Sequence, residues 1–227
     1  KRARKSLSLF GDTKQQMNSH GSNIKDIAEG LDSKQMSLDY NYRLPKAIAK
    51  VAQQIIGGGV DLMSNNQKDG GNSDYPNYPK PVITQYANPE KELEGILTRI
   101  QMEDLDDVAI LVPSDKEVMM VNDYLAKHGI KTQVMYRTGN TVPFRTVNTL
   151  DFSNNDLPCI LTYYSAKGSE FDNVFVPFAN TSNDCSRNSF YVACTRSSRS
   201  LYISFSGTKT KYLSDVNSDF ITELKVA

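Results

Sequence analysis

The sequence is poor in the residues that build metal sites and disulfide frameworks. It contains no Trp, two His and three Cys. Cys159, Cys185 and Cys194 are widely spaced, and none belongs to a Cys-x-x-Cys pair or lies near a His cluster. This spacing argues against a zinc site and against a disulfide framework, so we expect no metal ligands here and a reducing compartment.

Long apolar runs and a net charge are also absent. No apolar run approaches the roughly 20 residues of a membrane span, and no signal-peptide pattern opens the sequence. We therefore expect a cytoplasmic protein without membrane contact. The 26 basic residues are balanced by 26 acidic ones. General attraction to nucleic acid is not indicated, so any strand binding has to come from a local patch.

What the sequence does contain is an alternation of strand and helix patterns. Strands are expected near 82–86, 108–112, 132–135, 158–164, 174–178 and 201–205, and helices near 45–56, 89–102, 114–129 and 188–194. This order predicts an open, mostly parallel α/β sheet with helices on both faces and ligands at the carboxyl ends of its strands. The 227 residues suffice for one ample core, or for one domain and a fragment of another.

One stretch interrupts this alternation. Residues 61–81 are rich in Asn, Gly, Pro and Ser. Because such a composition lacks the apolar content needed to order itself, it predicts a long mobile surface loop.

Two arginines occupy positions suited to phosphate binding. Arg196 lies at an expected helix-to-strand junction, where its charged fork of donors can face a docking anion. The alternative is an ordinary solvated arginine. Tyr42 and Arg43 directly precede a helix expected to begin at Pro45, and a helix N-terminus favours anions. A buried ring packed on the sheet is the alternative for Tyr42.

A polar loop and a turn add further candidates. Gly168 follows an expected strand and lets the backbone approach a ligand, while Glu170 can accept from a sugar hydroxyl. The alternative for Glu170 is a surface carboxylate paired with Lys167. Gln15 stands shortly after a Gly-Asp turn, and its alternative is a turn-flanking amide.

Four blocks in this order resemble helicase motifs three to six of the UvrD/Rep/PcrA superfamily I. They are Leu9-Phe-Gly-Asp-Thr-Lys-Gln15, Asn41-Tyr-Arg-Leu-Pro45, Lys167-Gly-Ser-Glu-Phe171 and Tyr191-Val-Ala-Cys-Thr-Arg196. The resemblance spans residues 7 to about 205 and implies a three-layer, RecA-like (P-loop NTPase-like) fold. It further implies that 1–35 is the tail of a first RecA-like domain and 36–227 a second one. The short spacing from Arg43 to Thr162 is more similar to the helicase IV branch than to UvrD itself.

The resemblance also implies roles for single residues. Arg43 and Arg196 correspond to arginine fingers, and Gln15 corresponds to the glutamine that senses the terminal phosphate of the nucleotide. The residues implied to hold the rest of the nucleotide are Tyr42, Gly168 and Glu170. In that family the nucleotide is ATP with Mg²⁺.

Contacts to single-stranded DNA are implied for Thr162, Tyr164 and His20. Three positions depart from the family pattern. His20 stands where a Trp is usual, Tyr164 where a His is common, and Ser169 where a Leu is usual. Because Tyr can still stack on a base, these departures weaken the expected strand contact without removing it.

Together these features predict the C-terminal motor domain of an ATP-dependent DNA helicase or translocase. The sequence has no Gly-x-x-x-x-Gly-Lys-Ser/Thr loop and no Asp-Glu pair after a strand, so we expect an N-terminal RecA-like domain of the same protein to hold ATP and Mg²⁺. The chain alone is predicted to hydrolyse no ATP. Two alternatives remain: a nucleotide-driven remodelling factor acting on a protein partner such as RNA polymerase, with little unwinding, and a structural domain with vestigial motifs.

Overall fold

The structure is a computed structural model that describes residues 11–17, 24–31, 34, 36, 41–59, 61–63, 78–139, 145–182 and 185–226. His20 and most of the loop expected at 61–81 lie outside the described residues. Predictions about them therefore stay predictions.

The described strands form one sheet of eight, in the order β4-β3-β5-β2-β6-β7-β1-β8. The strands are β1 (Val82–Tyr86), β2 (Val108–Val112), β3 (Gln133–Thr138), β4 (Arg145–Asn148), β5 (Cys159–Thr162), β6 (Phe171–Val176), β7 (Ser197–Ser206) and β8 (Thr222–Lys225). Every neighbouring pair is parallel except β3 and β4, which are antiparallel. The predicted mostly parallel sheet is confirmed.

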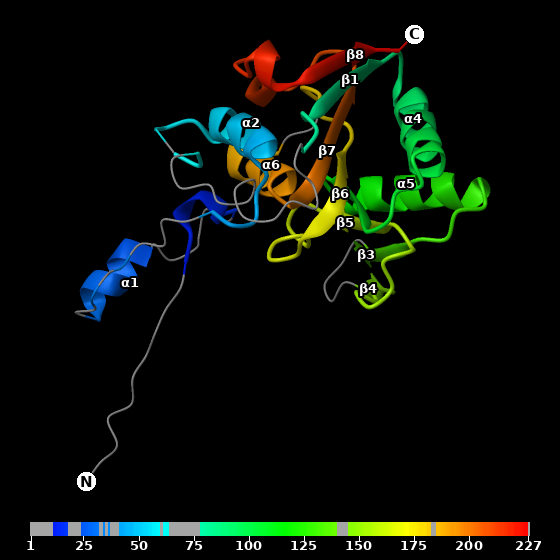
Figure 1. Cartoon of the computed structure of the whole chain (residues 1–227). Coiled ribbons are helices and arrows are strands. Elements are labelled where there is room, and N and C mark those ends of the chain that lie inside the picture. The colour runs from blue at the N-terminus through cyan, green and yellow to red at the C-terminus, as the bar shows by residue number, and fades with distance from the viewer. Residues whose placement is uncertain are drawn as a thin grey trace.

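Helices cover both faces of this sheet (Figure 1). The larger helices are α2 (Lys46–Ile56), α4 (Pro89–Met102), α5 (Asp115–Lys127) and α6 (Arg187–Cys194). The shorter ones are η1 (Thr13–Gln15), α1 (Ile24–Gly30), η2 (Lys211–Leu213) and η3 (Ser218–Phe220). Helices α2 and α6 lie on one face, α4 and α5 lie on the other, and α1 stands apart from the sheet. The result is the predicted three-layer α/β fold.

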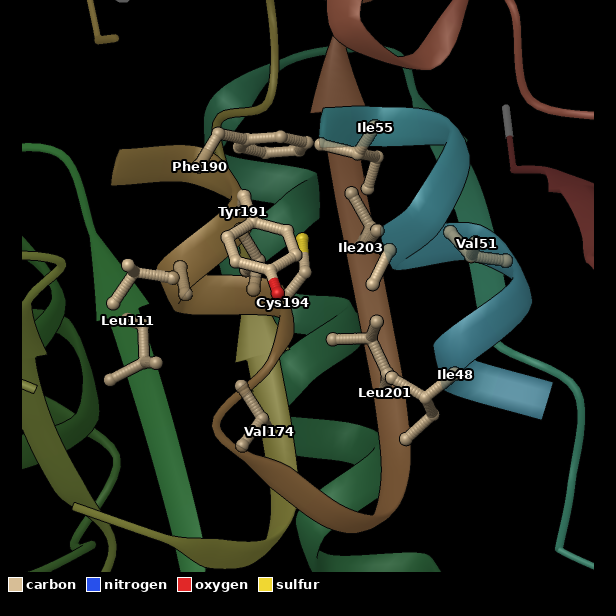
Figure 2. Packing of buried hydrophobic residues seen from close by; sticks show 14 of the residues in the cluster. Ile48, Val51, Ile55, Leu111, Val174, Phe190, Tyr191, Cys194, Leu201 and Ile203 are labelled. Carbon is tan, nitrogen blue, oxygen red and sulfur yellow. The ribbon is translucent and has the colours of Figure 1, made fainter. Parts of the chain in front are cut away.

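The core under α2 and α6 fixes the position of α6 (Figure 2). Ile48 and Ile55 of α2 pack toward Leu201 and Ile203 of β7, and Phe190 of α6 joins the same cluster. All five side chains are at most 3% exposed. Apolar residues at helical spacing on α2 and α6 therefore meet alternate residues of β7. This packing holds α6 against the sheet.

Local signals set the ends of the helices on the other face. Ser114 caps α5 by accepting from the Lys116 N–H, and its hydroxyl donates to Glu117 rather than forming the reciprocal bonds of the expected capping box. Gly129, with φ of +78°, ends the same helix in the left-handed region that suits glycine. The bounds expected for 82–86, 89–102 and 108–112 are those observed for β1, α4 and β2.

Three features of the sheet were not predicted. Strand β7 begins at Ser197 rather than near Leu201, because Phe171 of β6 already pairs with Ser197. The edge strands β4 and β8 are mostly exposed, so their sequences carry little apolar alternation.

Within the described residues, no helix combines the length and apolar character that crossing a membrane requires.

Candidate functional site

Arg196 lies between the end of α6 and the start of β7. Thr195 is the C-cap of α6, and β7 begins at Ser197. The main-chain oxygen of Arg196 accepts from the N–H of Phe171 at 3.0 Å. This bond brings the amino ends of β6 and β7 together, with Glu170 one residue away.

The Arg196 side chain is buried, with the whole residue 1% exposed. Its Nε donates to the Val192 carbonyl at 2.9 Å, Nη1 to the Ser169 carbonyl at 3.2 Å, and Nη2 to Thr195 Oγ1 at 3.2 Å. Across the described ranges, no carboxylate lies within ion-pair distance of it. The guanidinium is therefore buried without a counter-charge, and the solvated-arginine alternative is wrong.

Arg43 is positioned by a turn before α2. Asn41 Oδ1 accepts from the N–H of Arg43 at 3.3 Å and of Leu44 at 3.0 Å. Leu44 is buried in the core, and Pro45 is the N-cap of a helix that begins at Lys46, one residue later than expected. Arg43 Nε lies 3.9 Å from Glu170 Oε2, with side chains 33% and 47% exposed. So long and exposed an ion pair is weak, and both groups can be recruited by a ligand.

The two guanidinium groups lie close enough to repel each other. Burial and, after it, the charge of Arg43 lower the pKa of Arg196 to about 10, while Tyr191, Glu170 and Asp12 act in the opposite direction. Burial raises the pKa of Tyr191, and both arginines oppose that rise. At neutral pH Arg196 therefore remains charged. Two cations held together at one buried edge favour an anion beside them.

The segment 11–17 packs against α6 and reaches the same cluster. Asn188 Nδ2 donates to the Gln16 carbonyl at 2.8 Å, an anchor that the sequence did not reveal because nothing local marks it. The amide of Gln15 donates to Asp12 Oδ2 at 2.9 Å within its own turn. The side chain of Gln15 therefore bonds within its own turn, as the turn-flanking alternative predicts. Its role as a phosphate sensor stays a prediction.

The loop between β5 and β6 contributes Gly168 and Glu170. Gly168 has φ of +92°, and no atom lies within 4 Å of the position a Cβ would take. Its backbone is therefore open to a ligand. The ion-pair partner of Glu170 is Arg43 rather than Lys167. Tyr42 is 67% exposed, so the buried-ring alternative for this residue is wrong.

The residues expected to contact a DNA strand lie elsewhere. Thr162 ends β5 and is buried, and its hydroxyl donates to Ser165 Oγ at 3.0 Å and accepts from the Ser165 N–H at 3.1 Å. Tyr164 is 54% exposed. Ligands were expected at carboxyl ends of strands. Of the candidate residues, Thr162 and Tyr164 lie at such an end, that of β5, whereas Arg196 and Glu170 lie at the amino ends of β7 and β6.

The thiols and carboxylates show no sign of a metal site. Within the described ranges, no group of His, Cys, Asp and Glu is arranged to hold a metal ion. Cys159, Cys185 and Cys194 form no disulfide bond with one another. Burial raises the pKa of Cys159 to about 11 and raises that of the fully buried Cys194 further. Such thiols are unreactive at neutral pH.

Comparisons with known proteins agree with this architecture. Residues 158–204, which include Glu170 and Arg196, match the family model of the UvrD-like helicase C-terminal domain. The resemblance to UvrD-type helicases is thus confirmed over this stretch, whereas the helicase IV branch stays a prediction. No curated protein matches the chain.

A solved structure shares the fold. The C-terminal domain of a possible DNA helicase from Lactobacillus plantarum WCFS1 is 20% identical, with a TM-score of 0.57, over 80% of this chain and 98% of that one. This likeness confirms the RecA-like fold expected from the motifs. An Arterivirus nonstructural protein 10 helicase in complex with DNA is similar over a smaller part, with 9% identity and a TM-score of 0.45 over 64% of this chain and 35% of that one.

Proposed function

We propose that this chain is the second RecA-like domain of an ATP-dependent DNA helicase or translocase. In this proposal Arg43 and Arg196 contact the terminal phosphates of ATP, which an N-terminal RecA-like domain of the same protein holds together with Mg²⁺. The observation that carries the proposal is the buried guanidinium of Arg196, which lies beside a second cation and has no carboxylate partner in the part of the chain that the structure describes.

Burying a charge without a partner of opposite sign is costly, and the three hydrogen bonds of Arg196 offset that cost. A fold that keeps two cations together at the start of β7 is therefore better explained by a ligand that completes them than by stability. Arg196 uses three of the five N–H groups that a guanidinium offers. A phosphate can accept the others, and Arg43 can release Glu170 to bind the same group.

Neighbouring residues fit the rest of a nucleotide. The open backbone at Gly168 and the half-exposed carboxylate of Glu170 suit a polar ligand. The exposed ring of Tyr42 can stack on a base. When bound, ATP supplies the phosphoryl group, and the residues of this chain bind it, orient it and balance its charge.

We assign contact with single-stranded DNA to the carboxyl ends of the β-strands, away from the arginine pair. Tyr164 is exposed beyond the carboxyl end of β5 and can stack on a base of single-stranded DNA. Because Arg196 lies at the amino ends of the β-strands, the nucleotide and the DNA engage different parts of one sheet. Closure of the domains around ATP would then move the end of the sheet that contacts DNA.

The test is ATP turnover by the complete protein carrying Arg43→Ala. An arginine supplied from outside the phosphate loop is worth about a thousandfold or more in rate, so we expect a loss of that order. Arg137→Ala, at an exposed position on β3, is the matched control and should leave turnover unchanged. Equal turnover by the two variants would contradict the proposal.

The chain alone should hydrolyse no ATP, because its sequence lacks the phosphate loop and the Asp-Glu pair. Purified 227-residue chain is assayed for phosphate release beside the same chain carrying Arg196→Ala. Robust turnover that this substitution abolishes would show that the chain holds ATP and Mg²⁺ without a partner domain.

A further inference from the structure

A cavity lies where β1 and β7 begin, and neither Arg43 nor Arg196 is among its lining residues. It has a volume of about 460 Å³ and is bordered by the residues before β1, the end of α4 and the first half of β7. Small-molecule sites span about 300–1,000 Å³. The cavity is therefore large enough for a ligand the size of one nucleotide. The lining side chains that matter here are Lys80, Arg99, Glu103, Arg199 and Tyr202.

The lining of the cavity includes neighbouring residues of β7 that point to both faces of the sheet. Tyr202 packs with Phe175 in the core cluster beneath α4 and α5. Leu201 belongs to the cluster beneath α2 and α6 and also lines the cavity. Because successive residues of a strand point to opposite faces, the cavity lies at the end of the sheet where β1 and β7 begin.

One wall of the cavity is rigid. The Tyr202 ring stacks on Phe175 at 4.7 Å between centroids, and the Arg99 guanidinium carbon lies 4.7 Å from the Tyr202 ring centroid. Glu103 joins the two, since Tyr202 Oη donates to Oε2 at 3.0 Å and Arg99 Nη1 donates to Oε1 at 2.5 Å. These contacts fix the guanidinium plane before any ligand arrives, which lowers the entropy cost of binding.

The charge of the lining favours an anion. Among the described residues that line the cavity, three are cations, Lys80, Arg99 and Arg199, and one is a carboxylate, Glu103. Guanidinium and ammonium groups together are the usual ligands of phosphate, and a guanidinium held flat can also stack on a base. We propose that this cavity binds the phosphate group of an organic phosphate, supplied by a free nucleotide or by the end of a nucleic-acid strand.

The proposal is tested by calorimetric titration of the 227-residue chain with ADP and, separately, with a 5′-phosphorylated oligothymidylate. Arg199→Glu and Lys80→Glu reverse charges in the cavity, and Lys80 is exposed, so its replacement should not disturb folding. Lys131→Glu, at an exposed position outside the cavity, is the control. Each cavity variant should lower the affinity of the chain for at least one probe by about tenfold or more, as expected for the loss of a charge-assisted hydrogen bond. The control should leave both affinities unchanged.

The two probes distinguish the sources. Weakening of ADP alone identifies a nucleotide site, and weakening of the oligonucleotide alone identifies a strand-end site. Arg43→Ala separates this cavity from the arginine pair. If Arg43→Ala weakens binding and the cavity variants do not, the ligand sits at the arginine pair and the cavity proposal is wrong. It is equally wrong if neither probe responds to Arg199→Glu or Lys80→Glu.

Discussion

Two buried charges lie at opposite ends of the strand pair β6 and β7. Arg196 precedes β7, whereas Glu92 of α4 lies beneath the other end of β7, where Ser204 contacts it. Both residues are at most 1% exposed. Neither forms an ion pair among the described residues.

Their surroundings differ in one respect. Glu92 Oε2 accepts from the Phe178 N–H at 2.9 Å and from Ser204 Oγ at 2.9 Å. Phe178 has φ of +58°, so Glu92 secures a strained turn at the end of β6. Among the described residues no like charge lies beside Glu92, whereas Arg196 has Arg43 as a neighbour. Burial of a charge is therefore common to both positions, and the like-charged neighbour is what distinguishes Arg196.

The largest expected effect is the loss of turnover when the charge of Arg196 is removed. Arg196→Met keeps the length and apolar stem of the side chain but removes its donors. We expect the turnover of the complete protein to fall by about a thousandfold. The free energy of unfolding should change by less than about 1 kcal/mol, because the lost hydrogen bonds are offset by relief of desolvation. Kinetics and urea unfolding on one preparation measure both. A large loss of stability would make Arg196 structural.

Glu92→Ala should behave in the opposite way. It leaves the Phe178 N–H and the Ser204 hydroxyl without their acceptor, so we expect a loss of about 3 kcal/mol in the free energy of unfolding. Urea unfolding of the chain measures it, with the exposed Glu90→Ala on the same helix as control. If the two variants lose equally little, Glu92 does not hold this end of the sheet.

Glu92 should also make stability depend on pH. Burial raises its pKa above the ordinary value of 4.5. A raised folded-state pKa means that the stabilising contribution is complete below about pH 4.5 and is lost as pH rises through the folded-state value. Glu92→Gln cannot titrate, so its free energy of unfolding should fall less between about pH 5 and pH 8. Identical slopes in the two proteins would exclude Glu92 as the cause.

The smallest effect is expected at Gly168. Its φ of +92° is strained for any residue with a Cβ, although the space around it is open. Gly168→Ala should therefore lower stability by about 1 kcal/mol through backbone strain alone. Ser169→Ala is the control at the next position. A much larger loss would mean that the loop is packed more tightly than its open surroundings indicate.

The fold was more predictable than the site. The bounds of β2 follow from its short continuous apolar run, and those of α4 from its helical period and its N-cap Asn88. The exposed edge strand β8 carries no such pattern. The chain order of the motifs predicted that Arg43 and Arg196 would meet. It did not predict that Glu170 pairs with Arg43 or that Asn188 anchors the segment 11–17, because these contacts depend on tertiary packing.

The central claim is that the arginine pair receives the terminal phosphate of a nucleotide. The most direct measurement is a crystal structure of the complete protein with ADP and beryllium fluoride, a mimic of that phosphate. The account predicts guanidinium nitrogens of both Arg43 and Arg196 within about 3 Å of the fluoride or phosphate oxygen atoms. Arg196 still bonded only to Val192, Ser169 and Thr195, with the phosphate mimic out of reach, would contradict it.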